Sequence, residues 1–215
     1  MPKASLRSLP ENDLASFQSL QTGNDCGLHA LSAAIRLLCN VDIPPSSLIE
    51  ETNRLWWRGR FFRVFPSWAS TPQQLARLAN YLARLENLPI SAQVLHLSTQ
   101  VLRSLIPDPS LACVVTIYWL PSYVPSIYHW NSPRNVNEHQ GLEGHTMLLA
   151  AYDPSHFNGK VNTPWGFINS WVDRSSGLFW MGQEAFEKSW GFSLPIIGKH
   201  AAVIISRNDQ AMTLN

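Results

Sequence analysis

The stretch Gln21-Thr-Gly-Asn-Asp-Cys26-Gly-Leu-His-Ala-Leu-Ser-Ala-Ala-Ile-Arg-Leu-Leu38 decides how the rest of the chain can be arranged. It begins as a polar loop and continues as a good helix former that is apolar on nearly every side, which indicates a buried helix. Asn24 and Asp25 are residue types favoured at helix N-caps, so Cys26 should lie in the first helical turn.

A thiol in that position has chemical consequences. It faces unpaired backbone N–H groups and the positive end of the helix dipole, and both favour thiolate, so we expect a lowered pKa for Cys26. Gln21 could turn its amide N–H2 toward the same place, where an oxyanion would form, with Gln18 as a less favoured candidate. The stretch therefore indicates a nucleophile beside half an oxyanion hole. A buried structural cysteine is the alternative interpretation.

Length, charge and cysteine count exclude several classes of protein. The chain has 215 residues and a formal net charge of +1, which gives no electrostatic reason to expect nucleic acid or an anionic membrane as partner. Its 3 cysteines include no C-x-x-C pair, so neither a zinc site nor a redox dithiol is indicated. We find no signal peptide and no apolar run near the roughly 20 residues that span a bilayer. We therefore expect a cytoplasmic protein without a cofactor.

Secondary-structure patterns divide the chain into two halves. Helices are expected at about 26–39, 48–57 and 71–86, with short ones at 99–105 and 183–190. Strand-like runs follow at 111–120, 145–152, 165–171 and 201–206. This segregation predicts an α+β fold in a single domain, 1–215, with a helical lobe over about 1–110 and a β lobe over about 111–215.

The remaining members of a thiol site are sought in the second half. A cysteine nucleophile needs a base, and the base needs an orienting group. Of the 7 histidines, His145 opens a strong strand beside a flexible loop, a place that function often occupies. Asn169 lies in the apolar aromatic run 165–171, where a buried amide demands a hydrogen-bond partner. We expect its oxygen to hold Nδ1–H of His145, aiming Nε2 at Cys26, with Trp171 covering this bond.

Together these segments resemble the papain-like cysteine peptidases, in which the order is Gln, Cys, His, Asn. The matching parts are Gln21 and Cys26, the segment Gly144-His145 and the Asn169-Ser-Trp171 triplet. The resemblance implies that Cys26 is the nucleophile, His145 the base and acid, and Asn169 the orienting group. It also implies that Gln21 shares the oxyanion hole with the backbone N–H of Cys26, and that Gly144 and Trp171 face the substrate. The implied fold is a helical lobe bearing the Cys helix against a β-sheet lobe.

Details of the motifs differ from papain itself. The family's Cys-Gly-x-Cys-Trp is Asn24-Asp-Cys-Gly-Leu28 here, and Val172 replaces the usual glycine after Asn-Ser-Trp. The short spacing from Gln21 and the Cys-Gly-Leu-His order are similar to josephin-type deubiquitinases. The Asp-Cys-Gly start is similar to the leader-peptide peptidase domains of bacteriocin exporters. We expect a thiol hydrolase acting on peptide or isopeptide amides of a peptide or protein substrate.

Other interpretations stay open at this point. A transglutaminase-like acyltransferase would use the same triad with an amine as acceptor, and a non-catalytic papain-like module would only bind. A metal site is not expected, because the spacing of candidate ligands matches no compact motif; these ligands are His129, His139, His145, Asp153 and His156. His29, three residues after Cys26, is expected to be structural or to line the site. The aromatic run 56–65 and the long loop 121–143 are candidates for substrate contacts, or for plain packing and surface.

Overall fold

The computed structural model describes residues 3–55, 71–130, 132–137, 143–172, 177–193 and 198–208, and for 53–55 the backbone alone. The aromatic run 56–65 and His139 therefore lie outside the described residues.

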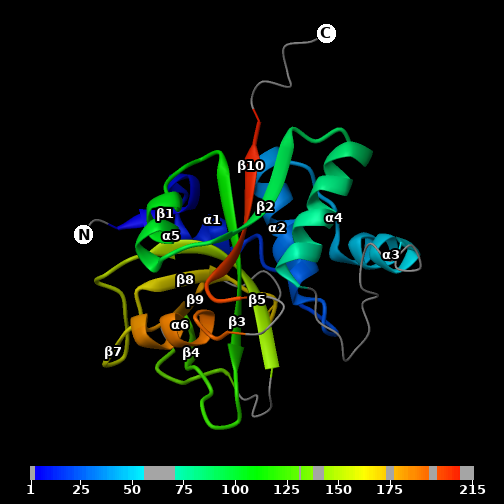
Figure 1. Cartoon of the computed structure of the whole chain (residues 1–215). Coiled ribbons are helices and arrows are strands. Elements are labelled where there is room, and N and C mark those ends of the chain that lie inside the picture. The colour runs from blue at the N-terminus through cyan, green and yellow to red at the C-terminus, as the bar shows by residue number, and fades with distance from the viewer. Residues whose placement is uncertain are drawn as a thin grey trace.

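The helices follow the sequence patterns closely (Figure 1). The described ones are η1 (Leu6–Ser8), α1 (Glu11–Ala15), α2 (Cys26–Cys39), α3 (Pro45–Leu55), α4 (Pro72–Leu85), α5 (Thr99–Leu105) and α6 (Gln183–Trp190). The predicted N-cap of α4 is present as a full capping box, in which Thr71 and Gln74 each bond the other's backbone N–H. At the other end of α2, Asn40 adopts a left-handed conformation with φ 56°, which closes the helix.

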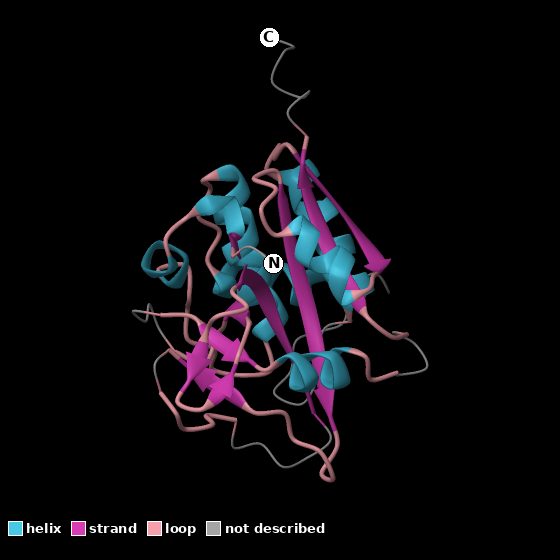
Figure 2. Cartoon of the chain, turned by 90° about the vertical axis from the view of Figure 1, so that its left-hand side faces the viewer, coloured by secondary structure: helices cyan, strands magenta, loops and turns pink. Residues whose placement is uncertain are grey.

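One large antiparallel sheet forms the centre of the molecule (Figure 2). The described strands are β1 (Ala4–Ser5), β2 (Ile90–His96), β3 (Leu111–Trp119), β4 (Ile127–His129), β5 (Glu143–Tyr152), β6 (Phe157–Asn158), β7 (Val161–Asn162), β8 (Trp165–Ile168), β9 (Phe179–Met181) and β10 (Ala201–Arg207). The order in the main sheet is β2-β10-β3-β5-β8-β9-β4, with β1 also paired to β5, while β6 and β7 form a separate hairpin.

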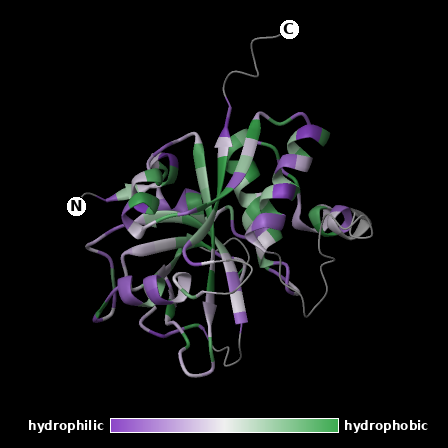
Figure 3. Cartoon of the chain, viewed as in Figure 1, coloured by the Kyte–Doolittle hydropathy of each residue, from purple (hydrophilic) through white to green (hydrophobic). Residues whose placement is uncertain are grey.

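Each face of the sheet carries its own hydrophobic core. Along β3, Ala112 and Val114 belong to the core under α2 and α4, whereas Cys113 and Val115 belong to the core under α5 and α6. This alternation is the ordinary period of a strand covered on both faces. Figure 3 shows hydrophobic colour concentrated in the central strands. The predicted α+β arrangement, with the Cys helix packed against an antiparallel sheet, is confirmed.

The main difference from the predicted strands is β2. It lies within the part expected to be helical, and it pairs with β10 over its whole length, from Ile90↔Arg207 to His96↔Ala201. A strand from the first half of the chain thus extends the sheet of the second half. The predicted loop 121–143 also contains a short strand, β4, which pairs with β9.

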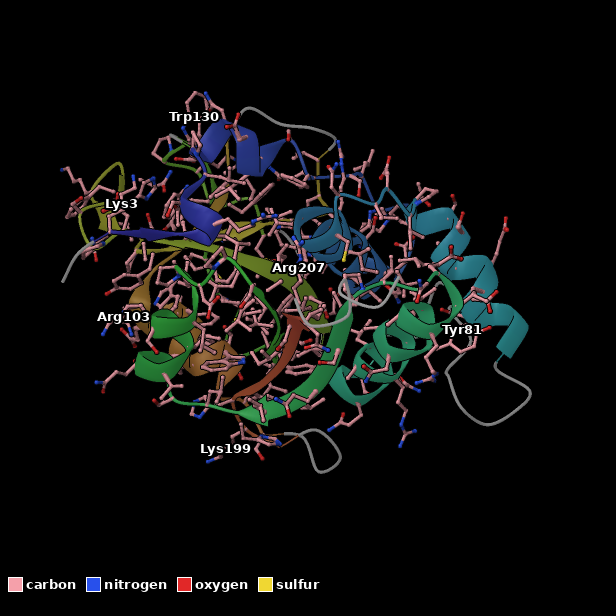
Figure 4. All side chains as sticks on the ribbon, turned by 90° about the horizontal axis from the view of Figure 1, so that it is seen from above. Lys3, Tyr81, Arg103, Trp130, Lys199 and Arg207 are labelled. Atoms are coloured by element: carbon pink, nitrogen blue, oxygen red, sulfur yellow. The ribbon has the colours of Figure 1, made fainter. Side chains whose placement is uncertain are left out.

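Two arginines hold the C-terminal end of α2 in place. Arg7 Nη1 donates to the carbonyl of Leu37, and Arg207 Nη1 donates to the carbonyl of Leu38 at 3.2 Å (Figure 4). Cations at a helix C-terminus satisfy its last carbonyls and complement the dipole. The helix that starts at Cys26 is therefore fixed at its far end by side chains from both ends of the sequence.

The N-terminal segment crosses the β lobe before it reaches α2. Lys3 Nζ pairs with Asp153 at 3.0 Å, at the edge of the molecule in Figure 4. Glu11 Oε1 accepts from the backbone N–H of Leu178 at 3.1 Å and from Nε1 of Trp180 at 3.3 Å. These bonds fix the segment that leads to residues 17–25. Within the described residues, no helix is both long enough and apolar enough to cross a membrane.

Candidate active site

Cys26 is the first residue of α2, as the sequence predicted. Asp25 precedes it as N-cap, but its carboxylate makes no capping bond to the helix backbone. The cysteine side chain is buried, with 6% of its surface exposed, and it lines a small cavity together with Gln18, His29 and Asn169.

Strand β5 brings the thiol to the neighbourhood of the candidate base. The backbone N–H of Thr146 donates to Sγ of Cys26 at 3.4 Å, across 120 residues of sequence. Thr146 directly follows His145, so the sulfur sits against the backbone of the strand that carries the imidazole. Sequence reasoning missed Thr146, and nothing in its local sequence marks it.

His145 and Asn169 are joined by a buried hydrogen bond, but through the other ring nitrogen. Nε2 of His145, not the expected Nδ1, lies 2.6 Å from Oδ1 of Asn169, and both residues are buried. The register explains why this prediction was wrong: Leu148 pairs with Ile168, so Asn169 lies diagonally across from His145. Diagonal neighbours are about 7–8 Å apart, so only the outer nitrogen of the ring reaches. Nδ1 stays close to the histidine's own strand.

Trp171 covers this pair as expected. Its ring stacks on the imidazole of His145 with centroids 4.5 Å apart and an interplanar angle of 25°. Phe179 meets Trp171 edge-on at 6.0 Å on the β-lobe side. An indole ring beside a hydrogen bond between histidine and an amide excludes water that would compete for that hydrogen bond.

The two candidate glutamines take different places. Gln21 Nε2 donates to the carbonyl of Gly23 at 2.9 Å, and its Oε1 accepts from Ser170 Oγ. Its backbone N–H also bonds the carbonyl of Ser170 at 2.8 Å, which ties the loop before α2 to the residue after Asn169. Gln18 lines the cavity with Cys26 and donates from Nε2 to the carbonyl of Gly177 at 2.9 Å.

The electrostatics of Cys26 differ from the expectation. Burial raises the pKa of its thiol, and this outweighs the N–H groups of Thr146 and Gly27, which act in the opposite direction. The negative charge of Asp25 raises the pKa further. The expected lowering from the helix N-terminus is thus wrong for the folded protein without substrate, because the helix end is not exposed.

Gly144, expected to face the substrate, has a packing role in the structure. A Cβ at this position would lie 2.7 Å from Cε1 and 2.8 Å from Cδ1 of Tyr118, a residue of the neighbouring strand. Its contact with substrate stays a prediction.

The other residue types considered are placed as follows. The described residues include no group of three or more histidine, cysteine or acidic side chains that could hold a metal ion. Cys26, Cys39 and Cys113 are all free thiols. His129 and His156 pack on Phe179 and Trp180, with centroids 4.7 Å and 3.6 Å apart, so both are parts of aromatic clusters.

Comparison with known proteins found similarity in the fold but none in the sequence patterns of families. No family model matches the chain, and no curated protein matches its sequence. Among solved structures, it is similar to a Bacillus anthracis protein provisionally described as a C39-like peptidase, with a TM-score of 0.56 and 14% identity. The match covers 95% of this chain and 98% of that one. At this identity the likeness shows the fold alone: the chain adopts the same mixed helix and antiparallel-sheet fold as that protein.

Proposed function

We propose that the protein is a cysteine peptidase that hydrolyses peptide or isopeptide amide bonds through Cys26, His145 and Asn169. The observation that carries the proposal is the buried 2.6 Å bond from His145 Nε2 to Asn169, beside the strand backbone that holds the Cys26 sulfur. A histidine that is oriented by a buried amide and covered by an indole is arranged as a general base, and the nearby thiol of Cys26 can be its proton donor.

The hydrogen bond between His145 and Asn169 supports the following proton steps. With Nε2–H donated to Asn169, neutral His145 leaves Nδ1 unprotonated as the base that takes the proton from Sγ of Cys26. The sulfur then forms a bond to the carbonyl carbon of the scissile amide, whose π electrons move to the oxygen. When the tetrahedral intermediate collapses, the C–N bond breaks and the imidazolium gives its proton to the leaving amine.

The second half of the cycle releases the acyl group. Water loses a proton to His145 and attacks the thioester carbon, and the C–S bond breaks to give a carboxylic acid and the free thiol. The N–H of Cys26 and an N–H of Gln21 would stabilise the oxyanion in both halves. The Gln21 amide keeps one hydrogen for this role, since its nitrogen has two and the bond to Gly23 uses one.

Charge balance supports an active role for His145 in this site. Because burial raises the pKa of Cys26, thiolate forms only if a positive group appears beside it. An imidazolium at His145 is such a group. Transfer of the thiol proton to His145 therefore creates both the thiolate and the positive charge that stabilises it.

The test is the rate at which iodoacetamide alkylates Cys26, followed at each cysteine by mass spectrometry between pH 5 and 9. Cys39, on the same helix, is an internal reference, since burial raises the pKa of its thiol too. We expect Cys26 to label at least about tenfold faster than Cys39 at pH 7, because transfer of its proton to His145 forms the thiolate in spite of burial; tenfold corresponds to one pKa unit. His145→Ala should remove this advantage, and Asn169→Ala should reduce it.

Turnover of a peptide mixture is the second readout. Cys26→Ala should abolish it with folding intact, and Asn169→Ala should slow it by on the order of ten- to a hundredfold, less than the loss of a full general base. Transfer of the acyl group to an added amine, rather than to water, would identify an acyltransferase with the same triad. Cys26 reactivity that is unchanged by His145→Ala would contradict the proposal and favour a binding module.

A further inference from the structure

Three polar side chains beside Cys26 form a hydrogen-bonded chain that the proposed mechanism does not use. Nε2 of His29 lies 3.4 Å from Oδ2 of Asp25, and Nδ1 of His29 lies 2.6 Å from Oγ of Ser19. Asp25 and His29 are buried, with 3% and 8% of their surfaces exposed. His29 and Ser19 line the same cavity as Cys26, and Asp25 is the residue before it.

The position of the Asp25 carboxylate is unusual for an N-cap. An N-cap aspartate ordinarily accepts from the helix backbone, which compensates its charge. Here the carboxylate makes no such bond, and its Oδ1 is buried without a hydrogen-bond partner among the described residues. His29 is the group that holds it, one helical turn away.

A buried negative charge at this place works against the proposed chemistry. The reaction creates a thiolate on the next residue, and two like charges close together in a buried site repel each other. The Asp25 charge does raise the pKa of Cys26. How the carboxylate is held therefore affects how easily the nucleophile forms.

We propose that His29 is a positioning residue for Cys26: it holds the Asp25 carboxylate away from the sulfur and ties the first turn of α2 to Ser19 in the cavity wall. The proposal rests on the proposed function, because it takes Cys26 to be the nucleophile. It assigns His29 no contact with the reacting atoms.

One tautomer of His29 satisfies its contacts with both Asp25 and Ser19. Burial lowers the pKa of His29, with Asp25 acting in the opposite direction, so the neutral ring is favoured. In that ring Nε2–H donates to Asp25, and the Ser19 hydroxyl donates to Nδ1. A side chain with one donor and one acceptor at similar positions could replace it, whereas an apolar side chain would release the carboxylate next to the sulfur.

The test uses the Cys26 alkylation rate at pH 7, relative to Cys39 in the same molecule. His29→Leu should lower the rate by about tenfold, equivalent to one unit in the thiol pKa. His29→Gln, whose amide can both donate and accept, should stay within about twofold of the unmodified protein. His156→Leu is the control: it removes a half-buried histidine that is packed on Trp180 outside the cavity, and it should leave the rate unchanged.

Removing the charge separates positioning from packing. Asp25→Asn should speed alkylation, and in the double variant with His29→Leu it should restore the rate, because the released group is then neutral. This restoration is not expected if His29 only fills space. Asp25→Asn and His29→Gln also carry the test if His29→Leu does not fold, as thermal melting would show.

The outcomes distinguish the two proposals. A Cys26 that is no more reactive than Cys39 in the unmodified protein would overturn the proposed function and this inference with it. A reactive Cys26 that His29→Leu does not slow, or that stays slow in the double variant, would overturn the inference alone. A slow His29→Gln variant would overturn it as well.

Discussion

Gly144 sits directly before the candidate base, and its lack of a side chain has a steric cause. The ring of Tyr118, on the adjacent strand, occupies the space that a Cβ would need, at 2.7 Å and 2.8 Å from two ring carbons. Carbon atoms cannot approach this closely, so any larger residue must move the tyrosine or the strand. The position of the His145 backbone therefore depends on this contact.

Gly144→Ala is expected to destabilise the protein by about 1–3 kcal/mol, the usual cost of overpacking a core. Urea denaturation would measure the loss. The double variant with Tyr118→Leu should recover part of it, because a smaller side chain frees the space. Equal destabilisation of the single and double variants would mean that the close contact is not what requires glycine here.

At the residue scale, the sequence predicted which side chains matter better than how they point. The Asn169–His145 pairing follows from chemistry alone, since a buried amide and a buried imidazole both need partners. The ring nitrogen depends on the register between β5 and β8, which no local pattern contains. The raised pKa of Cys26 depends on burial by residues distant in sequence. Its place at the helix start, taken alone, predicted a lowered pKa.

Among the elements, α4 shows a helix whose start is encoded locally. Thr71 and Gln74 form a reciprocal capping box, and Pro72 occupies the first position, where its missing N–H costs nothing. The helix packs against β2 and β10, and the hydroxyl of Tyr81 on its outer face donates to Glu51 of α3 at 2.6 Å (Figure 4). Its start thus affects the packing of two strands and another helix.

Thr71→Ala should lower the free energy of unfolding by about 1 kcal/mol, the typical loss of an N-cap. Thr71→Ser, which keeps the hydroxyl, is the matched control and should leave the free energy of unfolding nearly unchanged, because serine is at least as good an N-cap as threonine. Chemical denaturation followed by circular dichroism would measure both variants. Equal losses in the two would show that the hydroxyl bond does not stabilise the helix.

The strands that the sequence analysis missed are either too short or too unevenly buried to show a clear pattern of apolar residues. Strands β1, β4 and β9 have 2 or 3 residues, too few to show a period. β2 is longer, but its burial is mixed, because it lies at one end of the strand order and, among the described strands, pairs with β10 alone. By contrast, β3 and β5 are buried on both faces, and their apolar runs are plain in the sequence.

For the whole molecule, buried and half-buried histidines link stability to pH. Burial lowers the pKa of His29, His129 and His156, so the folded protein resists protonation that the unfolded chain accepts near pH 6.5. The unfolded state then binds more protons, and stability is lost as the pH falls below about 6.5. The melting temperature should therefore drop between pH 7.5 and 5.

His156→Gln should make this drop smaller, because the neutral amide does not titrate. Differential scanning fluorimetry of both proteins across that range would measure the difference. A melting temperature that is constant from pH 7.5 to 5, or an equal drop in the variant, would show that the buried imidazoles do not control acid stability.

The place of β10 has a consequence for how the protein is made. β10, residues 201–207, lies between β2 and β3 and is the strand through which β2 joins the sheet. During synthesis, α2 and its cysteine leave the ribosome long before this strand exists, so β2 cannot join the sheet until β10 emerges. A nascent chain would therefore carry the thiol without a completed scaffold around it.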